Sequence, residues 1–231
     1  MGETNPIVIP LDGMTRETAL EVAAKLAGRV WGFKVNDLLV ECGVGIISEL
    51  KQFGNVFADP KLHDIPNTVA NSMAKLAAAG ADLVTVHASG GVEMMKAAVD
   101  AAGESKVLAV TVLTSLDEDT AHLIFGNPVK ATVLQSARNA SLAGVYGVVC
   151  SPKELEILGR QPELQSLAKI TPGIRPAWYQ VGDDQKRTMT PAEAAKLGAT
   201  LQVIGRPILK AENPLEAVER TAQEIQEALA A

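Results

Sequence analysis

The residues of this chain best suited to chemistry lie in one short segment, ADPKLHDIPNT, at positions 58–68. Asp59, Lys61 and Asp64 place two carboxylates and an ammonium close together in the sequence. Side chains two apart on a strand point to the same face, so Asp59 and Lys61 are expected to project together. An ammonium held between carboxylates can stabilise developing negative charge and can deliver a proton as a general acid.

Metal ligands are not indicated around this segment. The chain has three histidines, and His63 is accompanied by neither HxH nor HExxH spacing. Cys42 and Cys150 are far apart and show no CxxC or Cys/His pattern, which favours reduced thiols in the core of a cytoplasmic protein. We therefore expect no metal at the site.

The elements that must position these residues alternate along the chain. Short runs rich in Val and Ile predict strands, and longer segments with helical period follow them. The expected strands are residues 6–12, 30–35, 55–61, 82–88, 106–113, 146–151, 168–174 and 201–207. Segments that start at Gly80, Gly144 and Gly198 share one pattern, in which a Gly ends a helix and an apolar strand and a small or polar turn follow. The eight expected strands, each followed by a helical segment, predict a single (β/α)8 TIM barrel over residues 1–231.

Composition and charge favour an α/β protein and limit its partners. Apolar residues make up 47% of the chain and aromatic residues 3%, so Ala, Val, Ile and Leu must fill the core, as in parallel sheets covered by helices. The net charge of −6 argues against nucleic acid or an anionic membrane surface as a partner. The sequence shows no signal peptide and no apolar run of roughly 18 residues, so we expect a cytoplasmic protein without a membrane partner. An open doubly wound sheet is the alternative fold, but its first turn, LDGMTRE at 11–17, lacks the GxGxxG of dinucleotide-binding sheets.

Charged and polar residues end several of the expected strands. Asp12 ends the first, Lys34 the second and Thr114 the fifth. In a (β/α)8 barrel these ends meet on one rim, where active sites form. Taken singly, charged residues at strand ends usually form surface salt bridges worth roughly 0–1 kcal/mol. Asp64 has a structural alternative of its own, as the N-cap of a helix with Pro66 in its first turn. Their coincidence on one rim favours a functional site.

Two turns near the C-terminus suggest the ligand. In IGRP at 204–207, Gly205 allows close backbone approach and the Arg206 guanidinium can fork onto phosphate oxygens. In eight-stranded barrels the loops after strands seven and eight frequently bind phosphate. Arg175, in the turn TPGIRP at 171–176, faces either solvent or the same ligand. We expect a phosphate monoester whose reacting end reaches toward Lys61.

Together these motifs resemble the orotidine 5′-monophosphate decarboxylase family over essentially the whole chain. DPKLHDIPNT at 59–68 is the most specific of them, and TPGIRP, GDDQ and IGRP support it. By position, the resemblance implies a catalytic set of four charged residues, which are Lys34, Asp59, Lys61 and Asp64. It also implies substrate contacts from Asp12, Lys34, Ile65, Thr68, Thr114, Pro172, Arg175, Gln185, Gly205 and Arg206.

The resemblance assigns these contacts to parts of the substrate and to subunits. Asp12 resembles the ligand of the ribose hydroxyls, while Thr114 and the backbone near Pro172 resemble the pyrimidine contacts. The phosphate contacts are Gln185, Gly205 and Arg206. Asp64, Ile65 and Thr68 are expected to come from the partner subunit, so each site of a homodimer would need two chains.

The implied activity is the decarboxylation of orotidine 5′-monophosphate to UMP in pyrimidine biosynthesis, without a cofactor and with Lys61 as the proton donor to C6. Residues around 176–185 are expected to form a loop that closes over the substrate. Mg²⁺-dependent sugar-phosphate decarboxylases and aldolases of the same superfamily are the enzymatic alternative; they share D-x-K-x-x-D but typically lack the I-P-N-T continuation. A non-catalytic barrel that binds a phosphate ligand is the other alternative, and it would need Gly205 and Arg206 but not Lys61.

Two positions depart from the family pattern. Position 36 is Asn where Gly is usual, which leaves open whether Asn36 displaces Lys34. Position 60 is Pro where Leu or Val is usual. Because proline has no N–H and is awkward inside a sheet, the third strand is expected to end at Pro60.

Overall fold

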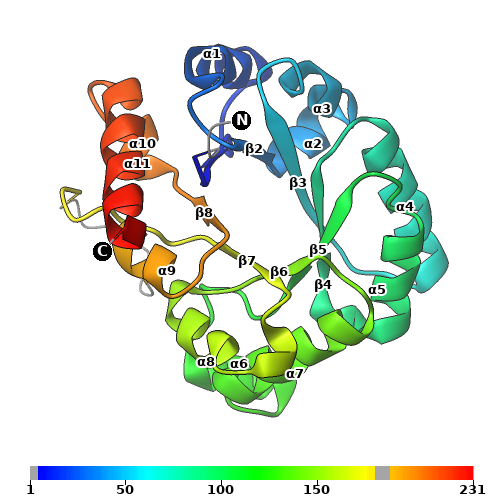
Figure 1. The fold of residues 1–231 in the computed structure, drawn as a ribbon. Helices are drawn as coiled ribbons and strands as arrows, with labels where there is room; N and C mark the ends of the chain where they lie inside the picture. Colours follow the sequence, from blue (N-terminus) through cyan, green and yellow to red (C-terminus); the bar gives the residue numbers. More distant parts are fainter. Residues whose placement is uncertain (1–4, 180–187, 231) are drawn as a thin grey trace.

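Eight short parallel strands close into a barrel in the computed structural model, which describes residues 5–179 and 188–230 (Figure 1). The strands are β1 (Ile7–Pro10), β2 (Gly32–Val35), β3 (Asn55–Leu62), β4 (Leu83–His87), β5 (Lys106–Val110), β6 (Gly147–Val149), β7 (Ala168–Thr171) and β8 (Leu201–Val203). Each strand pairs with the next, and β8 closes the ring on β1 through the pairs Ile7↔Gln202 and Val8↔Val203. The predicted TIM barrel is confirmed and the open sheet is wrong.

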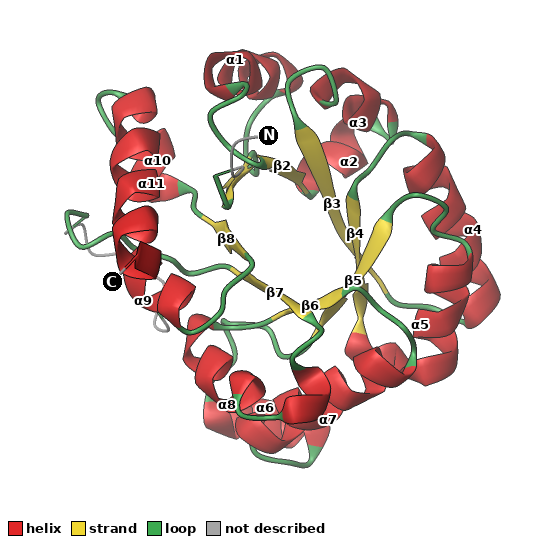
Figure 2. Ribbon diagram, viewed as in Figure 1, coloured by secondary structure: helices red, strands yellow, loops and turns green. Residues whose placement is uncertain are grey.

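Helices form an outer layer around the strands (Figure 2). The α-helices are α1 (Arg16–Leu26), α2 (Asp37–Cys42), α3 (Gly45–Leu50), α4 (Pro66–Ala78), α5 (Gly91–Asp100), α6 (Glu118–Phe125), α7 (Val129–Leu142), α8 (Leu155–Gly159), α9 (Pro191–Lys196), α10 (Arg206–Leu209) and α11 (Pro214–Ala230). Short 3-10 helices cover η1 (Ala88–Gly90), η2 (Pro152–Glu154) and η3 (Pro162–Leu164). Two long helical segments of the sequence are each divided in two, at Gly43 (φ 68°) and at Gly126 (φ 71°), because a residue in the left-handed region ends a helix. None of the helices in the described ranges is both long and apolar enough to span a bilayer.

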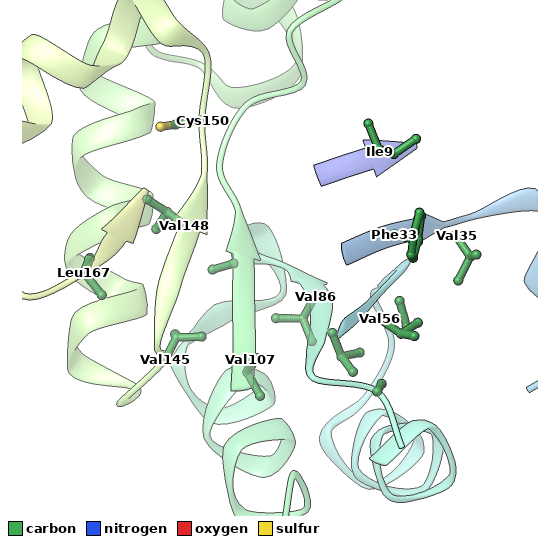
Figure 3. Packing of buried hydrophobic residues seen from close by; sticks show 14 of the residues in the cluster. Ile9, Phe33, Val35, Val56, Val86, Val107, Val145, Val148, Cys150 and Leu167 are labelled. Carbon is green, nitrogen blue, oxygen red and sulfur yellow. The ribbon is translucent and has the colours of Figure 1, made fainter. Parts of the chain in front are cut away.

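The core has two layers, as the alternation of side chains along each strand requires. Ile7 and Ile9 of β1 point outward to the helices, whereas Val8 between them points into the barrel. The outer layer is the larger one, and Figure 3 shows part of it, including Phe33, Val56 and Val107. The inner layer contains Val8, Phe57, Leu83, Leu108, Ala168, Ile170, Leu201 and Val203. These side chains fill the barrel and support its carboxyl rim from below.

The strand that carries Asp59 and Lys61 does not end at Pro60, so that prediction was wrong. β3 continues to Leu62, which pairs with Val86 of β4, and the register shifts between Ala58 and Leu62. An irregularity of this kind lets a strand pass a residue that has no N–H. Within it, Lys61 has φ 51°, the only positive φ of a non-glycine residue among those the structure describes.

Gly147 lies where β6 and β7 approach too closely for any side chain. A Cβ at this position would be 2.4 Å from the carbonyl oxygen of Ala168 and 2.8 Å from its Cβ. We expect Gly147→Ala to lower the free energy of unfolding by about 1–3 kcal/mol, measured by urea denaturation. Gly159→Ala is the control, because a Cβ there meets no atom within 4 Å and Ala favours the helical state by about 1 kcal/mol. Equal destabilisation by both substitutions would contradict the packing argument.

Candidate active site

A cavity of about 500 Å³ opens at the carboxyl ends of the strands. Its lining includes nine residues predicted from the sequence, which are Asp12, Lys34, Asp59, Lys61, Thr114, Pro172, Arg175, Gly205 and Arg206. Its apolar lining comes mainly from Phe57, Val110, Val112, Leu113, Val149, Val203 and Leu209. Asp12 and Thr114 lie in the loops beyond β1 and β5 rather than at the last residues of these strands. A cavity lined by both charged and apolar side chains suits a ligand that has both polar and apolar parts.

Four of these residues form a row of alternating charges, which we call the ion-paired cluster: Asp12, Lys34, Asp59 and Lys61. The Lys34 Nζ lies 2.7 Å from Asp12 Oδ2 and 3.3 Å from Asp59 Oδ2. The Lys61 Nζ lies 2.7 Å from the same Asp59 Oδ2. The side chains of Lys34 and Asp59 in the middle are 11% and 9% exposed, whereas those of Asp12 and Lys61 at the ends are 44% and 30% exposed. Buried charges are tolerated only when they are paired, so the middle of the row fixes its two accessible ends in the cavity.

Hydrogen bonds from two further side chains hold Asp59 in place. The Thr85 hydroxyl of β4 donates to Asp59 Oδ1 at 2.8 Å and accepts from the Lys61 N–H at 3.0 Å. The Asn36 side chain donates to the Asp59 carbonyl oxygen at 2.6 Å. Asn36 therefore bonds to β3, and Lys34 still contacts both carboxylates. Thr85 was not among the residues predicted from the sequence, where its signal is a hydroxyl within the otherwise apolar run LVTV.

Three of the predicted residues lie outside this cavity. Asp64, Ile65 and Thr68 are all exposed, and Ile65 is 66% exposed. The Asp64 carboxylate accepts a hydrogen bond from the Ile65 N–H at 2.7 Å and forms no ion pair with any residue that the structure describes. Helix α4 begins at Pro66 with Ile65 as its N-cap, so the alternative of Asp64 as the N-cap is wrong.

One predicted ligand contact and most of the predicted closing loop cannot be placed. Gln185 lies outside the described residues, as does the part of the 176–185 segment from position 180 onward. Among residues 5–179 and 188–230, no three His, Cys, Asp or Glu side chains are grouped so that they could hold a metal ion.

Two titratable groups, His87 beside the cluster and Cys150 on the cavity wall, stay uncharged at neutral pH. Burial lowers the pKa of His87, and the nearby His63 and Lys61 lower it further. The rings of His63 and His87 are 5.5 Å apart. Burial also raises the pKa of the Cys150 thiol, which is a poor nucleophile in that state. Neither group therefore adds a charge beside the ion-paired cluster.

Comparison with known proteins gives consistent matches over nearly the full chain. The family described as "Orotidine 5'-phosphate decarboxylase / HUMPS family" matches residues 5–221. A protein of Paramagnetospirillum magneticum named orotidine 5'-phosphate decarboxylase is 42% identical over 96% of this chain and 98% of its own length. A protein of the same name from Parasynechococcus marenigrum is 43% identical over 92% of this chain and 91% of its own. The crystal structure of orotidine 5'-phosphate decarboxylase from Lactobacillus acidophilus superposes with a TM-score of 0.82 at 35% identity, covering 96% of this chain and 99% of that one.

Proposed function

This chain belongs to the orotidine 5′-phosphate decarboxylase / HUMPS family, and from this membership we propose how its cavity carries out the decarboxylation. The enzyme is a carboxy-lyase of pyrimidine biosynthesis that converts orotidine 5′-monophosphate to UMP. The observation that carries the proposed mechanism is the ion-paired cluster, which has Lys61 at one of its two accessible ends.

The reaction leaves an electron pair with little stabilisation. When the bond between C6 and the carboxylate breaks, CO₂ departs and the pair stays on C6, where no neighbouring carbonyl delocalises it. The Lys61 ammonium, held 2.7 Å from Asp59, places a fixed positive charge for that pair. It then transfers a proton to C6 as a general acid and regains one from water. In this mechanism Asp59 lies near the departing carboxylate, and Lys34 balances the charge of Asp59.

Contacts with the rest of the substrate hold C6 at Lys61. Thr114 and Pro172 lie on the cavity wall assigned to the pyrimidine, and Asp12 is assigned to the ribose hydroxyls. Gly205 and Arg206 bind the phosphate; a Cβ at Gly205 would lie 2.9 Å from Pro10 Cγ, so this position also needs glycine for packing. Binding energy from the non-reacting phosphate can be used to orient the substrate and to close a loop over it.

The active form is proposed to be a cytoplasmic homodimer with shared sites. Within one chain, the ion-paired cluster supplies Lys61 with a single carboxylate, that of Asp59. Asp64 and Ile65 lie exposed outside the cavity of their own chain, which makes them available to a second copy. Asp64, Ile65 and Thr68 of each chain would complete the site of its twin. No nucleic acid or membrane takes part.

A direct assay distinguishes this function from its alternatives. Purified protein is expected to consume orotidine 5′-monophosphate, followed by the loss of orotate absorbance, at the same rate with and without EDTA. A Mg²⁺-dependent sugar-phosphate enzyme would leave this substrate unchanged and would lose its own activity in the chelator. A non-catalytic barrel would bind the nucleotide and leave its absorbance constant.

Arg206→Ala is expected to raise KM for the substrate by about 10- to 100-fold with a smaller effect on kcat, because a charge-assisted pair with phosphate is worth about 1.5–3 kcal/mol. Inhibition by UMP should weaken by a similar factor, whereas inhibition by uridine, which has no phosphate, should not change. Arg160→Ala is the control, since Arg160 is the exposed C-cap residue of α8 and pairs with Glu156. A normal KM in Arg206→Ala would remove this residue from the phosphate site.

A further inference from the structure

Thr85 is the only described residue whose side chain hydrogen-bonds to both Asp59 and Lys61. It lies in β4, on the inner face of the barrel that it shares with Leu83, and is completely buried. Its hydroxyl has a single hydrogen, which goes to Asp59 Oδ1, and an oxygen lone pair that accepts the Lys61 N–H. Both bonds run from one strand to its neighbour at the site of the register shift in β3.

The Lys61 backbone needs contacts with neighbouring residues to stabilise its conformation. Its φ of 51° places a side chain with a Cβ in the left-handed region, which costs roughly 1–2 kcal/mol relative to ordinary backbone. Such a conformation persists only where the surroundings fix it. The Thr85 hydroxyl supplies one such contact at 3.0 Å from the Lys61 N.

The same hydroxyl fixes the rotation of the Asp59 carboxylate. Because Oδ1 is occupied by Thr85, Oδ2 is left for both ammonium groups, at 2.7 Å from Lys61 Nζ and 3.3 Å from Lys34 Nζ. Without this bond, the carboxylate could turn about its terminal torsion, for which preferences are broad. The direction in which Lys61 points into the cavity depends on both contacts.

We propose that Thr85 is a positioning residue for the decarboxylation: one buried hydroxyl sets both the backbone of Lys61 and the orientation of the Asp59 carboxylate that holds its ammonium. This inference rests on the proposed role of Lys61. Thr85 touches no reacting atom; it acts by keeping the proton donor aligned with C6. A displacement of the order of 1 Å at a reacting group can reduce a rate by roughly 10²-fold.

The test is a graded series at position 85, measured beside the wild-type enzyme. Thr85→Ser keeps the hydroxyl and should retain kcat within about 3-fold, whereas Thr85→Val has the same shape without it and should lower kcat by about 10- to 100-fold. Thr85→Cys, which offers only a weak donor, should fall between them. KM should change by less than about 3-fold throughout, because the phosphate and ring contacts are untouched. Each kcat is obtained by dividing the maximal rate by the concentration of sites, which is counted by calorimetric titration with UMP.

Thr111→Val is the matched control. Thr111 is 3% exposed on the segment after β5, and its hydroxyl donates to the Val149 carbonyl at 3.1 Å, away from the ion-paired cluster. Its loss should lower the melting temperature while kcat per site stays at the wild-type value. A merely structural role for Thr85 would give the same result in Thr85→Val, and a wild-type kcat per site there would overturn the proposal.

A second variant keeps the inference testable if Thr85→Val does not fold. The cysteine side chain is small and common in protein cores, so Thr85→Cys is expected to fold. A wild-type kcat per site in this variant would also overturn the proposal. If the wild-type protein does not turn over orotidine 5′-monophosphate, the proposed function is wrong, and this inference is wrong with it. The two failures are therefore distinguishable in one set of assays.

Discussion

Lys61→Ala is expected to lower kcat by at least about 10⁴-fold, because it removes both the charge that stabilises C6 and the proton that reaches it. General acid catalysis alone typically contributes about 10²–10⁴-fold, and loss of one preorganised electrostatic contact costs about 10²–10³-fold. Binding of UMP should remain measurable by calorimetry, since its phosphate and ring contacts lie elsewhere in the cavity. The variant should therefore separate binding from turnover.

Lys106→Ala is the matched control for that experiment. Lys106 lies at the first residue of β5, at the opposite end of the strands from the cavity, with its Nζ 4.2 Å from the centre of the Tyr146 ring. Removal of an ammonium there should leave kcat unchanged, because it changes the charge of the chain without touching the cluster. Full activity in Lys61→Ala, by contrast, would refute the proposed proton donor and favour a barrel that only binds its ligand.

The residues that sequence analysis identified share a position that the fold determines. Once the alternation of apolar runs and helical segments indicates a closed barrel, every strand must end on one rim, and Asp12, Lys34 and Lys61 are assigned to that rim by counting along the chain. In the structure, Lys34 Nζ of β2 lies 2.7 Å from Asp12 Oδ2 in the loop after β1, and Lys61 Nζ lies 2.7 Å from Asp59 Oδ2 of the same strand. The positions of charged residues at the strand ends therefore predict much of the site.

What the sequence did not reveal depends on contacts between strands. Thr85 is one hydroxyl within an apolar strand, and only the pairing of β4 with β3 brings it to Asp59 and Lys61. Pro60 predicted a strand end by local rules, but the register shift allowed β3 to continue. Neither a shift of register nor a cross-strand hydrogen bond has a periodic signature, so local patterns could not predict them.

The buried middle of the cluster carries a cost in stability that function can explain. Lys34 and Asp59 are nearly inaccessible, and burial of charges is offset only in part by their mutual attraction. Apolar residues of similar volume often stabilise a protein at such positions. A cluster that supplies a fixed electric field to a reacting carbon has a reason to keep these charges, because preorganised charges need not reorient as the reaction proceeds.

The largest recovery of activity is expected from mixing two inactive variants, Lys61→Ala and Asp64→Asn. If Asp64 acts in the site of its partner, a mixed dimer has one site with both residues intact and one with neither. Random assembly of equal amounts makes half of the dimers mixed, so activity should rise from near zero to about one quarter of the wild-type value. The two variants are unfolded and refolded together, and turnover is compared with that of each variant refolded alone.

The control uses two residues from the same side of the cluster, Lys61→Ala mixed with Lys34→Ala. Lys34 and Lys61 both contact Asp59 of their own chain, so every mixed site lacks one of them and no activity should return. If Asp64 instead served its own chain, its mixture with Lys61→Ala would stay as inactive as this control. That result would refute the shared site, because the inactivity of Asp64→Asn would then mean that Asp64 acts within its own chain.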